Sequence, residues 1–366
     1  SSDIRDTFGR KLIEYKLDDK ANESMNKAFH TKFSDLRKQW LADYTPGNSV
    51  MNWKANEPEI KPLSISDFID NELIKFSIDD CKRSIPNLID GLKEGHRKIL
   101  YGAFLKKLKY EGKELKVAQF GNYVAEKTAY HHGENNLCLT VVAMAQGFVG
   151  SNNIPLLDRC GGFGSRKSGG NDAGQPRYIN TKLDKLTRLL FPEEDEPLLE
   201  YNEDDGDLVE PKNYVPIIPM VLVNGVVGIG TGWSCNIPCF NPLDLVGCIK
   251  AWLEMDGMVF DDEGSCSLPE LIPWYRGFTG KIEKEEEGKY ITWGNIKRGE
   301  GRNKNKVYVS ELPINYWTDD FQNDLDSARE NKNISSYSNN SKPNTVDFTI
   351  VELKDGMTLN ENNLKL

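Results

Sequence analysis

The chain has 366 residues, seven of them cysteine, and its 56 Asp and Glu outnumber 46 Lys and Arg, which gives a net charge of −10 at pH 7. This length allows two or three domains, and no apolar run approaches the ~20 residues that a membrane-spanning helix needs. The cysteines form no CxxC pair and the first residues do not resemble a signal peptide, which argues against a zinc ribbon or a disulfide framework and favours a reducing compartment.

Charge is unevenly distributed along the chain. Residues 80–191 carry 18 Lys and Arg against 10 Asp and Glu, whereas residues 192–366 carry 16 against 32. A basic centre between acidic flanks can neutralise nucleic-acid phosphates locally, despite the negative total. An ordinary solvated surface would give the same counts, so both interpretations stay open.

The first predicted element is an amphipathic helix at residues 25–41. Its apolar side chains recur every three or four residues, as a buried helix face requires; they are Met25, Phe29, Phe33, Leu36 and Trp40. Turn-forming residues 44–48 end this helix, and residues 48–62 are expected to be a linker.

Residues 63–191 are expected to form a domain with a dense core. Helices are predicted from Ser66, at residues 96–107, and from Gly133. A strand is predicted at residues 177–183, and this order is typical of a helix-turn-helix with a β wing. Two helices have clear apolar faces. The first comprises Ile99, Leu100, Ala103 and Phe104, with Arg97, Lys98, Lys106 and Lys107 off the face, and the second comprises Leu137, Val141, Met144, Ala145 and Phe148.

The character of the chain changes after residue 192. An acidic linker at 193–196 precedes an apolar, proline-punctuated run at 214–223, which is expected to form buried strands. Four later segments show the β-branched alternation of strands; they are 280–284, 289–293, 306–312 and 345–353. These patterns predict a mixed α/β second domain.

Two glycine-rich loops do not fit the known nucleotide-binding motifs. In residues 225–233 the third glycine of GxGxxG is replaced by Trp233, and residues 161–170 contain no GK[ST]. Tight turns and close backbone packing explain both loops better.

His131 and His132 are adjacent and precede Gly133. Neighbouring helical residues point ~100° apart, so the pair lacks the i, i+4 spacing of a helical metal site. One imidazole could face a phosphate beside the amides of a helix start. A capping or core histidine is the interpretation that the residues alone favour.

Tyr178 is the candidate nucleophile. It follows Arg177, and Arg166 and Lys167 precede it on a glycine-rich loop, where they are expected to contact nucleic acid. A phenol with a pKa near ~10 needs a nearby cation or base to attack a phosphate, and an arginine fork donates to two phosphate oxygens. Most tyrosines pack rather than react, so the residues alone leave both interpretations open.

Eight segments of the sequence closely resemble the DNA breakage-reunion region of type IIA DNA topoisomerases. The resemblance is to the eukaryotic and viral topoisomerase II branch rather than to gyrase. The matching segments keep the family's order. They are RSIPNLIDGLKEGHRKIL (83–100), KVAQF (116–120), YHHGENNL (130–137), AQGFVGSNNI (145–154), FGSRKSGG (163–170), PRYI (176–179), VEPKNYVPIIPMVLVNG (209–225) and GIGTGWSCNIP (228–238).

The resemblance implies an α+β chain in three parts. Residues 1–60 would be the end of a TOPRIM domain and a linker, residues 61–192 a winged-helix DNA-cleavage domain, and residues 193–366 a truncated tower domain. Tyr178 would attack a DNA phosphate to give a transient 5′-phosphotyrosyl double-strand break, and Arg177 would steady that phosphate. Four residues would line the DNA, and a fifth would insert between base pairs and bend the duplex; they are His131, His132, Lys116 and Gln119, and Ile229.

The resemblance also implies cofactors and partners. Mg²⁺ would be bound by the TOPRIM domain and ATP by an ATPase domain, both outside this chain, which itself would hold no metal. The partners would be double-stranded DNA, a second copy in a homodimer, and the TOPRIM and ATPase regions of the same polypeptide, in a nucleus or in a virion and its infected host cell, with no membrane. The chain would be one piece of an ATP-hydrolysing isomerase and inactive by itself.

Two other functions are compatible with the residues. A non-catalytic winged-helix module would bend DNA without a covalent adduct, although it would not need Arg177 and Tyr178 together. An adaptor could instead use the acidic region after residue 192 to contact protein alone.

Overall fold

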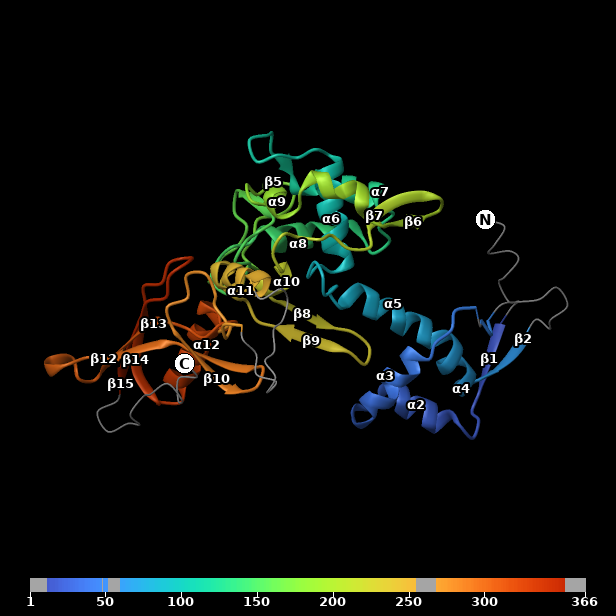
Figure 1. Cartoon of the computed structure of the whole chain (residues 1–366). Coiled ribbons are helices and arrows are strands. Elements are labelled where there is room, and N and C mark those ends of the chain that lie inside the picture. Colours follow the sequence, from blue (N-terminus) through green and yellow to red (C-terminus); the bar gives the residue numbers. More distant parts are fainter. Residues whose placement is uncertain (1–11, 48, 52–59, 255–267, 353–366) are drawn as a thin grey trace. The chain divides into compact units, whose positions relative to one another are not determined.

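A computed structural model describes residues 12–47, 49–51, 60–254 and 268–352. The chain divides into two compact units (Figure 1): residues 1–86 with 227–236, and residues 87–226 with 237–366. We call them the first and the second unit and describe each by itself. No helix in the described ranges combines the length and the apolar character that crossing a membrane requires.

The first unit packs short helices around a small core of Ala28, Trp40, Ile69 and Ile74. Strand β1 pairs with β2 in parallel, and a hairpin of β8 and β9 completes the unit. The bounds are β1 (Leu12–Lys16), α2 (Ala21–Phe29), η1 (Thr31–Phe33), α3 (Ser34–Ala42), β2 (Ile60–Ser64), α4 (Ile65–Phe68), η2 (Ile69–Leu73), α5 (Ile74–Ser84), β8 (Val226–Ile229) and β9 (Ser234–Ile237).

The prediction of a single helix at residues 25–41 is wrong, since the segment forms parts of two helices, α2 and α3. His30 is extended (φ −76°, ψ 133°) and separates α2 from the turn before α3. The buried face of α2 consists of small residues, namely Ala21, Ser24 and Ala28. Of the predicted apolar face only Trp40 is buried; the exposed members are Met25, Phe29, Phe33 and Leu36.

The second unit begins with three helices on a small antiparallel sheet, in the order β3-β5-β4. The predicted apolar faces around Ile99 and Val141 are confirmed, since both side chains are fully buried in one continuous core. The strand predicted from residue 177 begins only at Asn180. The bounds are α6 (Glu94–Leu105), β3 (Leu115–Lys116), α7 (Val117–Lys127), α8 (Glu134–Ala145), β4 (Leu157–Cys160), β5 (Asn180–Leu183) and α9 (Thr187–Leu190).

The prediction of buried strands at residues 214–223 is wrong. Tyr214, Met220 and Val223 are buried as expected, but Pro216 and Pro219 interrupt the run and the backbone forms irregular chain and one helical turn, because proline cannot donate to a strand ladder. The neighbouring elements are η3 (Glu193–Leu198), β6 (Tyr201–Asp204), β7 (Asp207–Pro211), α10 (Met220–Val223) and α11 (Pro242–Glu254).

The C-terminal part of the second unit is a four-stranded sheet in the order β12-β13-β15-β14, with a separate hairpin of β10 and β11. Phe321 and Leu325 of α12 pack with Val309 and Phe348 of the sheet. All four predicted strands are present, and β12 and β14 are additional. The bounds are β10 (Lys281–Glu286), β11 (Lys289–Trp293), β12 (Asn295–Arg298), η4 (Gly301–Asn303), β13 (Lys306–Glu311), α12 (Thr318–Glu330), β14 (Ile334–Asn339) and β15 (Phe348–Glu352).

Candidate active site and nucleic-acid interface

Tyr178 stands on a turn directly before β5. Its side chain is 73% exposed, whereas the side chain of Ile179 is only 4% exposed. The turn is closed by a hydrogen bond from the Tyr178 N–H to the Gln175 carbonyl, at 2.8 Å. The alternation places the phenol in solvent on a backbone that the next residue anchors in the core.

The start of α7 fixes this turn. The first free amides of a helix need acceptors, and here Val117 N–H donates to the Ile179 carbonyl and Ala118 N–H to the Pro176 carbonyl, both at 3.0 Å. In addition, Lys116 pairs with Asn180 across β3 and β5. These contacts bring the KVAQF and PRYI segments together, as a shared site requires.

Lys116 and Gln119 are both exposed, at the start of α7. Both residues therefore belong to the segment whose backbone amides hold the Tyr178 turn. The sequence predicted both as DNA contacts, and the structure leaves both accessible.

Arg177 is exposed beside the phenol. Its guanidinium carbon lies 5.1 Å from the centroid of the Tyr178 ring, and its Nε and a terminal nitrogen donate to Gln175 Oε1 at 2.9 and 2.6 Å. A neutral amide thus orients the guanidinium without neutralising its charge. Sequence reasoning missed Gln175, although its place two residues before Arg177 was the available signal.

The two histidines lie ahead of α8 rather than on it. Both side chains are exposed, so the interpretation as core histidines is wrong. His131 Nε2 is 3.7 Å from Asp204 Oδ2 at the end of β6, and the His132 ring meets Tyr130 edge to face at 5.5 Å. An exposed pair before a helix start is accessible to a phosphate.

The two basic residues of the glycine-rich loop have opposite environments. The Lys167 side chain is 57% exposed and lies 3.8 Å from Asp319. Arg166 is 4% exposed; it forms an ion pair with Glu311 and donates to the Leu312 carbonyl at 2.9 Å. The expectation that Arg166 contacts nucleic acid therefore fails for this structure, because its guanidinium is enclosed and bonded by protein.

Ile229 lies at the end of β8, in the first unit, and its side chain is 76% exposed. The hairpin is held on α5, because Thr231 Oγ1 donates to Asp80 at 3.0 Å and Cys81 Sγ donates to the Thr231 carbonyl at 3.1 Å. A Cβ on Gly228 would lie 2.8 Å from the Ser84 carbonyl oxygen. That glycine is therefore required by packing within the protein, and the apolar Ile229 side chain remains outside.

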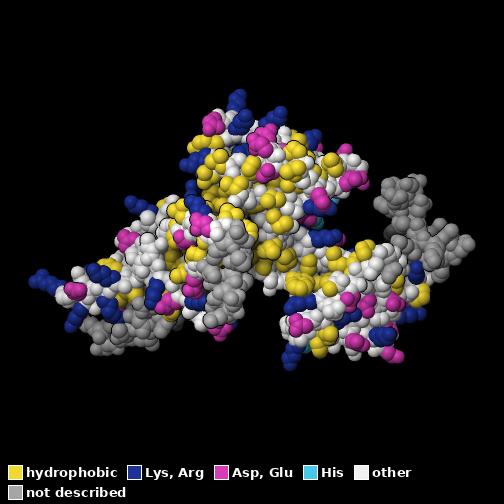
Figure 2. Space-filling view, in the orientation of Figure 1, with side chains coloured by type: hydrophobic (Ala, Val, Ile, Leu, Met, Phe, Trp, Pro, Cys, Tyr) yellow, Lys and Arg dark blue, Asp and Glu magenta, His cyan; other side chains and the backbone are white. Residues whose placement is uncertain are grey.

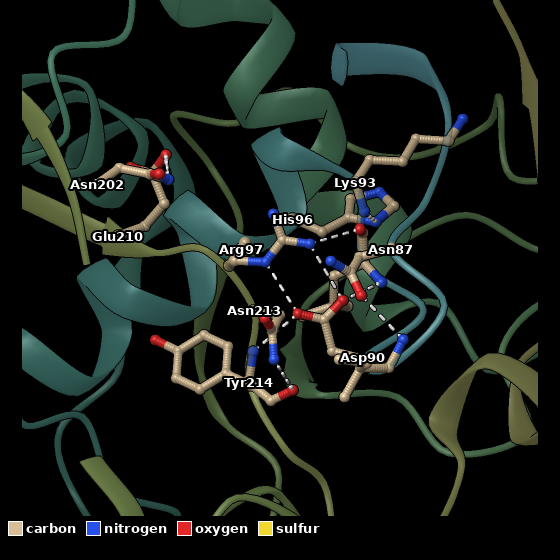
Figure 3. Close-up of polar contacts among 11 residues, drawn as sticks. Asn87, Asp90, Lys93, His96, Arg97, Asn202, Glu210, Asn213 and Tyr214 are labelled. Carbon is tan, nitrogen blue, oxygen red and sulfur yellow. Dashed lines mark hydrogen bonds and ion pairs between the residues drawn. The ribbon is translucent and has the colours of Figure 1, made fainter. Parts of the chain in front are cut away.

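A network of buried polar side chains lies within the second unit (Figure 3). Arg97, predicted to lie off the apolar face of its helix, is 7% exposed and donates to Asp90 at 2.8 and 3.1 Å. Asp90 also accepts from the Tyr214 N–H at 2.9 Å. Lys98, likewise predicted off the face, is 5% exposed. Both residues were expected outside the core but are buried, because Asp90 pairs with Arg97 and Glu210 pairs with Lys98.

Lys98 links the network to the histidine segment. Its Nζ donates to Glu210 and to the Thr128 carbonyl, both at 2.8 Å. Thr128 lies three residues before His131, so a buried lysine holds the backbone that leads to the exposed pair. The network is structural rather than a contact surface.

Exposed positive charge gathers elsewhere in the second unit. Figure 2 shows Lys and Arg side chains at the top of the view, over the loop that joins α6 to β3. The exposed lysines of this loop are Lys106, Lys107, Lys109 and Lys113. No group of three or more His, Cys, Asp or Glu side chains within the described ranges is placed to hold a metal ion.

Two family models together match most of the chain. Residues 83–366 match the family model for the A subunit of DNA gyrase/topoisomerase IV, and residues 2–81 match the C-terminal associated domain of TOPRIM. The chain is 47% identical over 350 residues to DNA topoisomerase 2 of Invertebrate iridescent virus 6, covering 95% of this chain and 30% of that protein. It is 47% identical over 306 residues to DNA topoisomerase 2 of Saccharomyces cerevisiae, covering 84% of this chain and 20% of that protein.

Among solved structures, the chain is similar to the DNA-binding, cleavage and re-ligation domain of Plasmodium falciparum topoisomerase II, with a TM-score of 0.77 and 41% identity. That match covers 93% of this chain and 44% of the other. The chain thus spans about a third or less of the viral and yeast relatives. From the extent of these matches, the chain belongs to the type II DNA topoisomerases, in the DNA gyrase/topoisomerase IV family and its topoisomerase 2 branch.

Proposed function

We propose that this chain is the DNA breakage-reunion part of an ATP-dependent type II topoisomerase. The observation that carries the proposal is the placement of Tyr178: an exposed phenol beside a guanidinium, on a turn fixed by the amides of α7. We divide the chain into three parts: residues 1–60 as the end of a TOPRIM domain and a linker, residues 61–192 as a winged-helix domain, and residues 193–366 as a tower.

In the proposed reaction, Tyr178 Oη attacks the phosphorus of a DNA phosphodiester. The O–P bond forms, the P–O3′ bond breaks, the phenol proton leaves to solvent, and the released 3′ oxygen takes up a proton. The product is a phosphotyrosine linked to the 5′ end of the broken strand. Because one phosphate ester replaces another, the reverse attack by the 3′ hydroxyl reseals the strand without an external energy source.

The residues around the phenol have distinct proposed roles. Arg177 donates to the oxygens of the attacked phosphate, where negative charge develops. Lys116, Gln119 and the exposed histidines contact the adjacent DNA backbone, and Lys167 adds positive charge. Ile229 inserts between base pairs, a step that costs a few kcal/mol of stacking and is offset by protein contacts on the bent duplex.

The remaining requirements lie outside this chain. A divalent metal would supply further charge stabilisation, bound by carboxylates of a TOPRIM domain, and ATP hydrolysis would drive passage of a second duplex. A homodimer would place one tyrosine on each strand. We propose a nuclear setting, or a virion and its host cell.

The test uses the complete polypeptide with Mg²⁺ and a duplex labelled at the 3′ end, quenched with detergent. Label is expected to become attached to the protein, to disappear with Tyr178→Phe and to persist with Tyr110→Phe, a control at another exposed tyrosine. Absence of attachment in the unaltered protein, with the DNA still bound and bent, would overturn the proposal in favour of a non-catalytic DNA-bending module.

A further inference from the structure

A buried ion pair joins the glycine-rich loop to the C-terminal sheet. Arg166 and Glu311, the last residue of β13, have side chains only 4% and 3% exposed. Glu311 also accepts from the N–H and the hydroxyl of Thr279, both at 3.0 Å. Its carboxylate is therefore the hub of an enclosed network, and Arg166 is the member that the loop contributes.

Trp317, just before α12, holds the same loop at a second point. A Cβ on Gly169 would lie 2.4 Å from the indole Nε1, so the loop backbone rests on the ring. The indole also meets Phe148 edge to face at 5.8 Å. Next to it, the Asp319 N–H donates to the Lys167 carbonyl at 2.9 Å.

The loop (residues 161–174) connects these contacts to the residues beside the tyrosine. Asp172 accepts from the Ser165 N–H and hydroxyl at 2.8 and 2.6 Å, which folds the loop back on itself. Gly174 N–H donates to the Gly162 carbonyl at 2.8 Å. A Cβ on Gly174 would lie 2.9 Å from the Ile179 side chain. The closed loop thus packs directly against the residue after Tyr178.

We propose that Glu311 and Trp317 are positioning residues for strand cleavage, acting through the loop on Tyr178 and Arg177. The inference rests on the proposed function. Removing one partner of a buried ion pair leaves an uncompensated charge, and the loop must then move to solvate it. A displacement of ~1 Å at the reacting group lowers the rate of a reaction about 100-fold.

The main test is Glu311→Gln in the complete polypeptide with Mg²⁺. At saturating DNA, the rates of adduct formation and of resealing are expected to fall about 10- to 100-fold, because both directions need Tyr178 in place. DNA affinity is expected to stay unchanged. The matched control is Glu352→Gln, which breaks an ion pair with Arg298 in the same sheet (2.8 Å) and is expected to leave both rates unaltered.

Double substitution separates positioning from general loss of structure. Arg166→Met combined with Glu311→Gln leaves no unpaired buried charge, so it is expected to cleave at least as fast as Glu311→Gln alone. Trp317→Phe, which retains an aromatic ring, is expected to give a milder loss of the same kind, and it serves if the charge variants do not fold.

Three outcomes would overturn the inference. One is an unchanged cleavage rate for Glu311→Gln and Trp317→Phe at saturating DNA. Another is a rate per folded molecule that is unchanged although the melting temperature falls. The third concerns the slope of log K for DNA binding against log salt concentration. If Arg166→Met made this slope as shallow as Lys167→Met does, Arg166 would contact phosphate rather than position the loop. Absence of an adduct in the unaltered protein would instead reject the proposed function itself.

Discussion

At the scale of single residues, the site depends on neighbours with opposite environments. Tyr178 is exposed and Ile179 is buried; Lys167 is exposed and Arg166 is enclosed. Each buried member fixes the backbone from which its exposed neighbour projects. A charge or a phenol gains a defined position in this way without losing access to a ligand.

His96, in the first turn of α6, gives a prediction about pH. Burial, with Lys93 and Arg97 nearby, lowers the pKa of His96 to about 4, and the neutral Nδ1 accepts the Lys93 N–H at 3.5 Å. Above pH 6.5 the ring is neutral in the folded and unfolded states. Between pH 6.5 and pH 4 only the unfolded chain binds the proton, so the free energy of unfolding falls as the pH falls.

The measurement is the free energy of unfolding of the unaltered chain and of His96→Gln from pH 7.5 to pH 4. The unaltered chain is expected to lose up to about 2 kcal/mol more than the variant, less than the full pKa shift implies because His96 as a whole residue is only half-buried. Parallel curves for the two proteins would show that His96 is not the titrating group.

At the scale of elements, the sequence predicted best where one apolar pattern determines the structure. The faces of α6 and α8 and the strands β10, β11, β13 and β15 follow from their own residues. The prediction of strands at residues 214–223 failed because an apolar run that contains prolines can be buried without forming a strand ladder. Strands β12 and β14 carry polar residues, so only pairing with β13 and β15 reveals them.

The site was predictable to a different extent. The roles of Tyr178 and Arg177 rest on the family resemblance and stay predictions, while the structure shows that both residues, like Lys116 and Gln119, are exposed. The burial of Arg166 was not predictable, because the Leu312 carbonyl that it bonds lies 146 residues away and no local pattern signals such a contact.

The β8–β9 hairpin separates folding from function within one element. Gly228→Ala would place a methyl 2.8 Å from the Ser84 carbonyl oxygen and 2.9 Å from Pro86, and is expected to destabilise the first unit by about 1–3 kcal/mol.

Ile229→Ala, at an exposed position, is expected to leave the melting temperature unchanged and to reduce DNA bending, as energy transfer between dyes at the two ends of a duplex would show. Equal bending by Ile229→Ala and the unaltered chain would exclude the wedge.

At the scale of the whole molecule, a net charge of −10 must be reconciled with the proposed binding of DNA. The negative excess lies after residue 192, while residues 80–191 are basic. Exposed charges farther apart than a Debye length, ~10 Å at 0.1 M salt, are largely screened from one another. Only acidic residues that lie within this distance, such as Asp319 beside Lys167, can offset the basic charges.

This arrangement predicts DNA binding by the chain that weakens steeply with salt. Each phosphate contact contributes about −0.9 to the slope of log K against log salt concentration. Lys116→Gln with Lys167→Gln is therefore expected to make the slope shallower by roughly 1.8, measured by fluorescence anisotropy between 50 and 200 mM salt. The control pair, Lys297→Gln with Lys304→Gln, removes two exposed lysines of the acidic region and is expected to leave the slope unchanged. If both pairs flattened the slope equally, binding would depend on total charge, and the local basic surface would have no special role.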